Sequence, residues 1–184
     1  MSARVLIATG DFGESLEVLY CYYRLQEEGI EPTIAAPDEK LLQLVVHDFE
    51  PGYDGYTEKP GYRVQAGTSY KDADPASFDG LIIPGGRAPE EIRSDNELLH
   101  IVRHFLAKDK PIGALCHGVM LLYTAGSIED VECTCYAGIR PDVEMAAGVY
   151  VDRDVVVHDN IVTSRGWPDL AAFCKTFIGV LGAR

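Results

Sequence analysis

The sequence has few basic residues and lacks any apolar run long enough to span a membrane. Its 184 residues include 16 Lys and Arg against 29 Asp and Glu, which gives a formal net charge of −13, and no basic cluster interrupts the acidic background. A negatively charged surface repels the phosphate backbone of nucleic acids, so we expect no nucleic-acid partner. No signal-peptide pattern follows Met1, and we therefore expect a cytoplasmic protein without membrane contact.

The sequence also lacks internal repeats, low-complexity tracts and the cysteine pattern of a disulfide framework. The cysteines are odd in number and scattered along the chain: Cys21, Cys116, Cys133, Cys135 and Cys174. A chain of this length can bury a sizeable core without disulfides, so we expect reduced thiols. The same length favours one domain, residues 1–184.

Apolar strand patterns alternate with amphipathic helix patterns along the chain. They predict strands at 5–8, 33–36, 80–84, 111–115, 131–135, 155–158 and 161–164, and helices at 14–28, 96–106, 117–124 and 168–181. A hairpin is predicted from 41–46 and 62–64, around an excursion at 51–61. This alternation is typical of an α/β fold with a mainly parallel sheet covered on both faces, whose ligand site lies at the carboxyl ends of the strands.

One of these strands ends at Cys116, and a helix pattern follows at once. A nucleophile elbow needs small residues two positions before and two after the nucleophile, and Ala114 and Gly118 stand there. A thiol at a helix N-terminus meets unpaired N–H groups, which favour the thiolate. The pattern therefore predicts a reactive Cys116, and the alternative is a small buried apolar side chain.

Two other loops, 9–14 and 84–90, should meet Cys116 at the same edge of the sheet, and each brings a carboxylate. Here the chain resembles the PfpI-type intracellular proteases, in the superfamily that also holds deglycases and glyoxalase III enzymes. The resemblance spans nearly the whole chain. It is carried by Asp11-Phe12-Gly13-Glu14, Tyr20-Cys21-Tyr22-Tyr23-Arg24-Leu25, Glu27-Glu28-Gly29, Pro84-Gly85-Gly86-Arg87-Ala88-Pro89-Glu90, Cys116-His117-Gly118, Tyr136-Ala137-Gly138-Ile139 and Thr163-Ser164-Arg165.

The resemblance implies a flavodoxin-like three-layer sandwich, related to class I glutamine amidotransferases, with Cys116 as nucleophile and His117 beside it. It also implies that a glutamate of the first helix lies against the sulfur, and the motif favours Glu14 for this place. Near a thiolate and partly desolvated, the Glu14 carboxyl should have a raised pKa and could move a proton. Glu17, one helical turn later, is the competing carboxylate.

The resemblance further implies an oligomeric active site. In PfpI-type members a neighbouring subunit supplies a glutamate that orients the histidine, and Glu90 matches it; the alternative is a carboxylate at a helix start. The backbone N–H groups of Gly86, in the Gly85–Gly86 turn, and of His117 would form the oxyanion site. The glycine pair could also be an ordinary turn. Further pocket-lining residues implied by the motifs are Tyr136, Asp142 and Arg165.

No metal or other cofactor is expected. His100 and His104 share a helix face at i, i+4 spacing, but no third ligand is evident. A glutamine amidotransferase would need a late histidine followed by a glutamate two residues on, and His158 is followed by Asp159-Asn160, a hairpin-turn pattern.

The leading hypothesis is a cofactor-independent cysteine enzyme in which Cys116 attacks a carbonyl. Its chemistry is either peptide or amide hydrolysis or glyoxalase III or deglycase chemistry on α-oxoaldehydes or glycated adducts. The expected partners are a small carbonyl compound or a peptide as substrate and further copies of the chain, as a dimer, trimer or hexamer. The alternative is a protein that senses oxidative stress through oxidation of Cys116 with little turnover.

Overall fold

A mostly parallel sheet forms the centre of the molecule. Across residues 2–126 and 128–182, which the computed structural model describes, seven strands form this sheet in the order β10-β11-β7-β6-β1-β2-β5. Only the β10–β11 pair is antiparallel. The strands are β1 (Arg4–Ala8), β2 (Glu31–Ala36), β5 (Thr68–Ser69), β6 (Gly80–Ile83), β7 (Ile112–Leu115), β10 (Val155–His158) and β11 (Ile161–Ser164).

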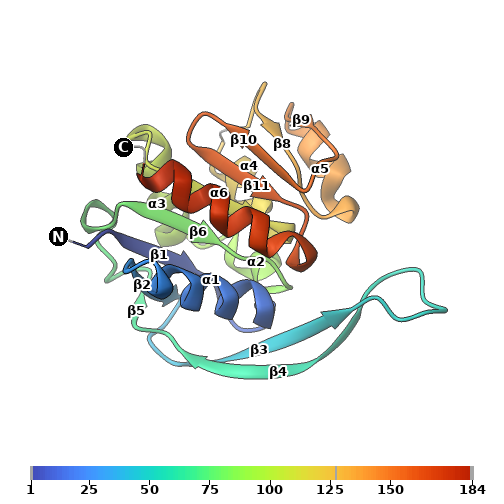
Figure 1. Cartoon of the computed structure of the whole chain (residues 1–184), viewed down its shortest axis with the longest axis horizontal. Coiled ribbons are helices and arrows are strands. Elements are labelled where there is room, and N and C mark those ends of the chain that lie inside the picture. The colour runs from blue at the N-terminus through green and yellow to red at the C-terminus, as the bar shows by residue number, and fades with distance from the viewer. Residues whose placement is uncertain (1, 127, 183–184) are drawn as a thin grey trace.

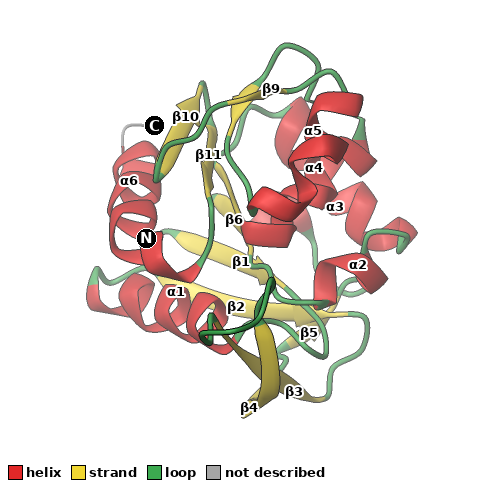
Figure 2. Cartoon of the chain, turned by 90° about the vertical axis from the view of Figure 1, so that its right-hand side faces the viewer, coloured by secondary structure: helices red, strands yellow, loops and turns green. Residues whose placement is uncertain are grey.

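Helices cover both faces of this sheet, as Figure 2 shows. Helices α1 (Ser15–Glu27) and α6 (Leu170–Gly182) lie on one face, and α2 (Ala88–Ile92), α3 (Asn96–Ala107), α4 (Met120–Ala125) and α5 (Arg140–Met145) lie on the other. The fold is therefore a flavodoxin-like three-layer α/β sandwich, which confirms the predicted fold class. The Asp159-Asn160 turn between β10 and β11 is also confirmed.

Burial on both faces explains why the central strands are continuously apolar. In β1, Val5 and Ile7 join the core beneath α1 and α6, whereas Leu6 and Ala8 join the core on the opposite face. Successive side chains of a strand point to opposite faces, so a strand between two helical layers needs apolar residues at every position. The two cores share this sheet as their common wall.

A long antiparallel hairpin stands apart from the central sheet. Strands β3 (Leu41–Asp48) and β4 (Thr57–Gln65) pair along their lengths, and Figure 1 shows the hairpin running past α1 and projecting beyond the body of the molecule. The predicted hairpin is confirmed, but its excursion is shorter than expected because β4 begins at Thr57, inside the segment 51–61. Cross-strand pairing extends the strand through polar residues that carry no strand pattern of their own.

Several short elements differ from the prediction. The predicted strand at 131–135 is only two residues long, β8 (Glu132–Cys133), and it pairs with β9 (Val149–Tyr150) in a separate small sheet. The strand β5 and the helices α2 and α5 were not expected. Each is only two to six residues long, too short for a hydrophobic period to show in the sequence.

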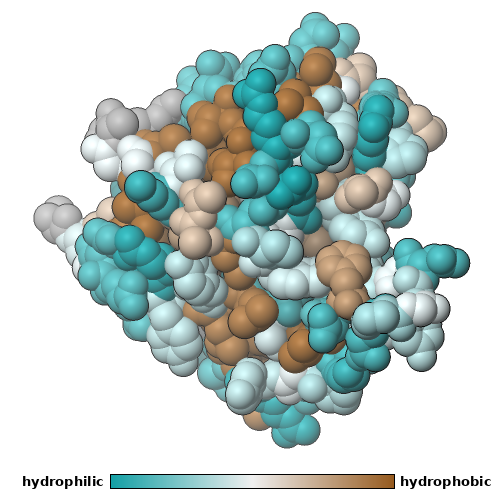
Figure 3. All heavy atoms as spheres, turned by 45° about the vertical axis from the view of Figure 1, so that its right-hand side comes forward, coloured by the Kyte–Doolittle hydropathy of each residue, from teal (hydrophilic) through white to brown (hydrophobic). Residues whose placement is uncertain are grey.

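Apolar residues reach the surface in separate patches among hydrophilic ones, as Figure 3 shows for one face. The exposed large apolar side chains include Leu16, Tyr20 and Tyr23 of α1 and Phe49 and Tyr53 at the tip of the hairpin. In the described part of the chain, no helix combines the length and the apolar character that a membrane crossing requires.

Candidate active site

Cys116 lies at a sharp corner between β7 and the helical turn that leads into α4. Its backbone φ is 54°, in the left-handed region that a residue other than glycine rarely adopts. A Cβ atom at Gly118 would lie 2.1 Å from the Ile83 carbonyl oxygen, so the turn can pass this strand only because residue 118 is glycine. The predicted sharp turn at Cys116 is confirmed, and its strained backbone directs the thiol toward the end of the sheet.

The sulfur of Cys116 is enclosed by backbone N–H groups and by a carboxyl. The side chain is 1% exposed, and the N–H groups of Gly86 and His117 both donate hydrogen bonds to it. Burial raises the pKa of the thiol well above its usual value, the charge of Glu17 raises it further, and the two N–H groups act in the opposite direction. Protonation of Glu17 removes the charge that opposes the thiolate, and the two N–H groups then act against burial alone.

Glu17, not Glu14, is the carboxyl at the sulfur. The Glu17 side chain forms a hydrogen bond with the Cys116 thiol, and its Oε2 accepts the Gly85 N–H at 2.6 Å. A Cβ atom at Gly85 would lie 2.9 Å from both Cys116 Sγ and Glu17 Oε2, so the absence of a side chain there lets the two groups meet. Burial, reinforced by the charge of Glu14, raises the pKa of Glu17 from 4.5 to about 8. At neutral pH the carboxyl therefore holds a proton that it can share with the sulfur.

Glu14 has a different position from the one predicted. It precedes the first residue of α1 and caps that helix, because its Oε2 accepts the Glu17 N–H at 2.8 Å. Capping turns the Glu14 side chain back over the first turn of the helix, and Glu17 on that turn faces the thiol instead. Burial raises the pKa of Glu14 as well. The prediction that Glu14 lies against the sulfur is wrong, and the competing carboxylate holds this place.

His117 lies beside the sulfur and is packed between aromatic rings. Its Nδ1 is 3.4 Å from Cys116 Sγ. The imidazole stacks on Tyr136, with ring centroids 5.0 Å apart, and Tyr56 meets it edge-on. Burial lowers the pKa of His117 to about 4, so the ring is neutral at physiological pH and one of its nitrogens can accept a proton.

The hairpin brings a second group of polar side chains to the edge of the site. His47 Nε2 lies 3.0 Å from Glu58 Oε2, and the Arg87 guanidinium donates to both oxygens of Glu58. The His47 ring also packs against Tyr56, with centroids 4.3 Å apart. These contacts connect both strands of the hairpin to the loop after β6 and hold Tyr56 over His117.

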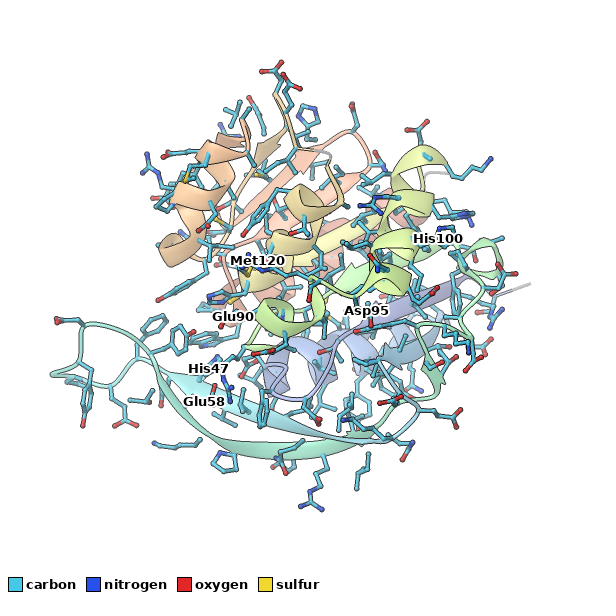
Figure 4. All side chains as sticks on the ribbon, turned by 180° about the vertical axis from the view of Figure 1, so that it is seen from behind. His47, Glu58, Glu90, Asp95, His100 and Met120 are labelled. Atoms are coloured by element: carbon cyan, nitrogen blue, oxygen red, sulfur yellow. The ribbon has the colours of Figure 1, made fainter. Side chains whose placement is uncertain are left out.

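The remaining predicted residues surround this centre at a greater distance. Figure 4 shows Glu90 on the same side of the molecule as His47 and Glu58, and its charge raises the pKa of Tyr56. Within the described residues of this one chain, Glu90 makes no hydrogen bond to His117. The charge of Asp142 acts to raise the pKa of His117, which places it near the imidazole.

Gly85 and Arg165 have partners that limit their predicted roles in binding substrate. The Gly85 N–H is occupied by Glu17, which leaves Gly86 and His117 as the N–H groups that face the sulfur. The Arg165 guanidinium is occupied by three aspartates: Asp152, Asp154 and Asp169.

Comparison with known proteins agrees with this geometry. Residues 3–179 match the DJ-1/PfpI family. The chain belongs to the DJ-1/PfpI family. The deglycase PfpI of Pyrococcus furiosus is 36% identical over 178 residues, which cover 97% of this chain and 99% of that protein.

Other members of the family differ in length or resemble the chain mainly in fold. Protein DJ-1 homolog D of Arabidopsis thaliana is 33% identical over 97% of this chain, which spans 48% of that protein, about half its length. Drosophila melanogaster DJ-1beta has a TM-score of 0.83 at 22% identity, covering 99% of this chain and 92% of that one. This structural likeness shows the shared fold.

The sequence of this DJ-1/PfpI protein did not reveal the contribution of the hairpin to the site. The available signal was a histidine directly after the apolar run Leu44-Val45-Val46, and in the structure the His47 ring is almost completely buried. The contact between His47 and Glu58 depends on cross-strand register, which sequence spacing alone does not give. Among residues 2–126 and 128–182, no group of three or more His, Cys, Asp or Glu side chains could hold a metal ion.

Proposed function

We propose that the chain is a cofactor-independent cysteine enzyme that acts on small carbonyl compounds, with glyoxalase III or deglycase chemistry at Cys116. The observation that carries the proposal is the buried pair of Cys116 and Glu17, a thiol and a carboxyl with a pKa of about 8 that share a hydrogen bond. Such a pair supplies a nucleophile and a proton carrier in one place. The relatives named as deglycases support the same chemistry.

The enclosure of the thiol supports a small substrate over a peptide chain. Cys116 is 1% exposed and His117 is 6% exposed, and the rings of Tyr56 and Tyr136 pack against His117. A peptide bond within a polypeptide can reach the thiol only if the flanking residues also enter this enclosure. A two- or three-carbon α-oxoaldehyde has no flanking residues. Peptide hydrolysis is therefore the less favoured of the two reactions.

The reaction begins when the Cys116 thiol passes its proton to the neutral His117, whose Nδ1 is 3.4 Å away, and the sulfur adds to the aldehyde carbon of an α-oxoaldehyde such as methylglyoxal. His117 then gives this proton to the oxygen of the adduct, which completes the hemithioacetal. The oxygen of the resulting hemithioacetal accepts the N–H groups of Gly86 and His117, which face the sulfur. Glu17 or the neutral His117 then moves a proton from the first carbon to the second, which gives a thioester of a 2-hydroxy acid. Water hydrolyses this thioester and releases lactate and the free thiol. With the hemiaminal of an amine and methylglyoxal, the C1–N bond breaks first: the nitrogen takes a proton and leaves as the free amine, the hydroxyl loses its proton, and the aldehyde that results is attacked as above.

The test is lactate formation from methylglyoxal without added glutathione or metal, with a fluorogenic peptide panel on the same preparations. We expect turnover in the wild type, none in Cys116→Ser and a strong loss in Glu17→Gln. Glu14→Gln is the comparison variant. It changes the carboxyl that caps α1 and removes only the smaller contribution to the raised pKa of Glu17, so it should retain more activity than Glu17→Gln. Cys116-dependent peptide cleavage without lactate would instead establish the hydrolase chemistry, and equal rates in wild type and Cys116→Ser would refute a cysteine mechanism.

We also propose that the chain forms one domain, works in the cytoplasm, and assembles with further copies so that Glu90 of a neighbouring subunit orients His117. The exposed position of Glu90 on α2 and the five free thiols support these proposals. Mixed oligomers of Cys116→Ser and Glu90→Ala test the assembly. If Glu90 acts on a neighbour, mixing restores activity. In a mixed pair, the Glu90→Ala subunit still has its Cys116 thiol, and the adjacent Cys116→Ser subunit supplies the intact Glu90. If mixing restores nothing, Glu90 does not act across subunits.

A further inference from the structure

A cavity of about 340 Å³ adjoins the active site, between the hairpin tip and the segments around Tyr136 and Trp167. Aromatic rings form much of its wall: Phe49, Tyr136, Tyr150 and Trp167. The rings of Phe49 and Trp167 stack at 5.1 Å with an interplanar angle of 22°. A volume of this size accommodates a small organic group and is typical of ligand pockets.

The cavity shares two wall residues with the catalytic centre. Tyr136 stacks on His117, and Gly166 lies against both members of the nucleophile pair. A Cβ atom at Gly166 would be 3.4 Å from Glu17 Oε1 and 3.9 Å from Cys116 Sγ. Gly166 and the Tyr136 ring therefore belong both to the cavity wall and to the surroundings of the reacting groups. A substrate held at the thiol has the cavity within reach of its remaining atoms.

The charge of the cavity opposes the binding of an anion. Arg165 lines it, but Nε and Nη2 of this guanidinium donate to the two oxygens of Asp169 at 2.9 and 3.0 Å. Nη2 also donates to Asp154 at 2.5 Å, and Nη1 contacts Asp152 at 3.4 Å. Arg140 adds a second guanidinium, 4.9 Å from the centroid of the Tyr150 ring, and it pairs with Glu144. Two cations thus face four carboxylates, so the cluster is negative overall and both guanidinium groups are already paired.

The same cluster and the aromatic walls favour a cation. Asp152 lines the cavity and its side chain is 75% exposed, so it can turn toward a ligand without unfolding the segment, and Asp154 adds negative charge beside it through Arg165. Aromatic faces attract an ammonium or guanidinium group through the ring quadrupole, most strongly for Trp. Carboxylates next to such a face add charge attraction and hydrogen bonds.

We propose that this cavity binds an alkylammonium or guanidinium group carried by the substrate whose carbonyl Cys116 attacks. The inference rests on the proposed function and narrows its substrate class to carbonyl adducts of cationic amines. In such an adduct the carbonyl carbons lie at the sulfur, and the cationic remainder passes Gly166 into the aromatic cavity. Anionic adducts are disfavoured by the net negative charge of the cluster.

Trp167 is the single tryptophan of the sequence and lies in the cavity wall, so its fluorescence reports ligand binding without any turnover. The experiment titrates the full chain with n-butylguanidinium, its neutral analogue n-butylurea, and pentanoate. We expect a saturable fluorescence change with n-butylguanidinium, binding about tenfold tighter than n-butylurea, a difference of about 1.4 kcal/mol. Pentanoate should leave the fluorescence unchanged.

Variants separate this inference from the proposed function. Cys116→Ser should bind n-butylguanidinium as the wild type does, because the cavity needs no nucleophile. Asp152→Asn should weaken this binding about threefold, whereas the matched control Asp38→Asn, an exposed aspartate before β3, should leave it unchanged. Binding of n-butylurea or pentanoate as tight as that of n-butylguanidinium would overturn the assignment, whether or not the protein produces lactate. A lack of lactate with selective guanidinium binding would overturn only the proposed reaction.

Discussion

Glu17→Gln should change how the stability of the protein depends on pH. Glu17 is fully buried, its Oε2 accepts the Gly85 N–H, and burial raises its pKa from 4.5 to about 8. Gln keeps a carbonyl oxygen for the Gly85 N–H but has no proton to lose. The substitution therefore removes the titration and leaves the size of the side chain almost unchanged.

The magnitude follows from the two pKa values. The folded protein holds the Glu17 proton up to about pH 8, whereas the unfolded chain releases it near pH 4.5. Between these values the folded state carries more protons, so a rise in pH lowers the free energy of unfolding. At about 1.4 kcal/mol per pH unit, the ionised carboxyl costs about 5 kcal/mol above pH 8. Below pH 4.5 the carboxyl is protonated in both states and this cost vanishes.

The assay is urea unfolding of wild type and Glu17→Gln at a series of pH values from 4 to 9. We expect the stability of Glu17→Gln relative to wild type to rise by about 5 kcal/mol across this range, because only the wild type loses stability through Glu17. Glu27→Gln, whose parent side chain is 71% exposed on the same helix, is the matched control and should follow the wild-type curve. A difference between Glu17→Gln and wild type that does not vary with pH would refute a raised pKa at Glu17.

Three further predictions test the elbow, the histidine and the helix cap. Gly118→Ala should lower the stability by about 1–3 kcal/mol, because its Cβ would lie 2.1 Å from the Ile83 carbonyl oxygen; an unchanged urea midpoint would contradict that contact. The imidazole of His117 should titrate near pH 4 by NMR, because burial lowers its pKa, and a midpoint above pH 6 would show a solvated ring. Glu14→Ala should cost about 1 kcal/mol of stability through the lost cap, while Glu14→Gln should leave the alkylation rate of Cys116 close to that of wild type.

Much of the fold followed from local sequence patterns. Strands buried on both faces must be apolar at every position, so segments such as 5–8 and 80–84 were visible as short continuous runs. The corner at Cys116 was also visible, because a sharp strand-to-helix turn needs small residues at fixed spacing, and Ala114 and Gly118 provide them. Short elements such as β5 and α2 were missed because two to five residues are too few to show a hydrophobic periodicity.

The sequence alone did not show which of two carboxylates faces the Cys116 sulfur. Glu14 and Glu17 are one helical turn apart, and each could have faced the sulfur. The choice depends on where α1 begins, at Ser15. Glu14, just before the helix, turns its side chain back to cap a free N–H group, whereas the side chain of Glu17, within the first turn, projects from the helix. Only the orientation of the helix on the sheet shows that this projection meets Cys116.

The sequence by itself determined the layers of the fold and the position of the sharp turn at Cys116, because these depend on periodicity and on spacing along the chain. The tertiary structure decided which carboxyl shares a proton with the thiol, how the hairpin places Tyr56 over His117, and that Arg165 is neutralised beside an aromatic cavity. The first two features join residues far apart in the chain. Their pairing is set by strand register and helix packing, which no local pattern encodes.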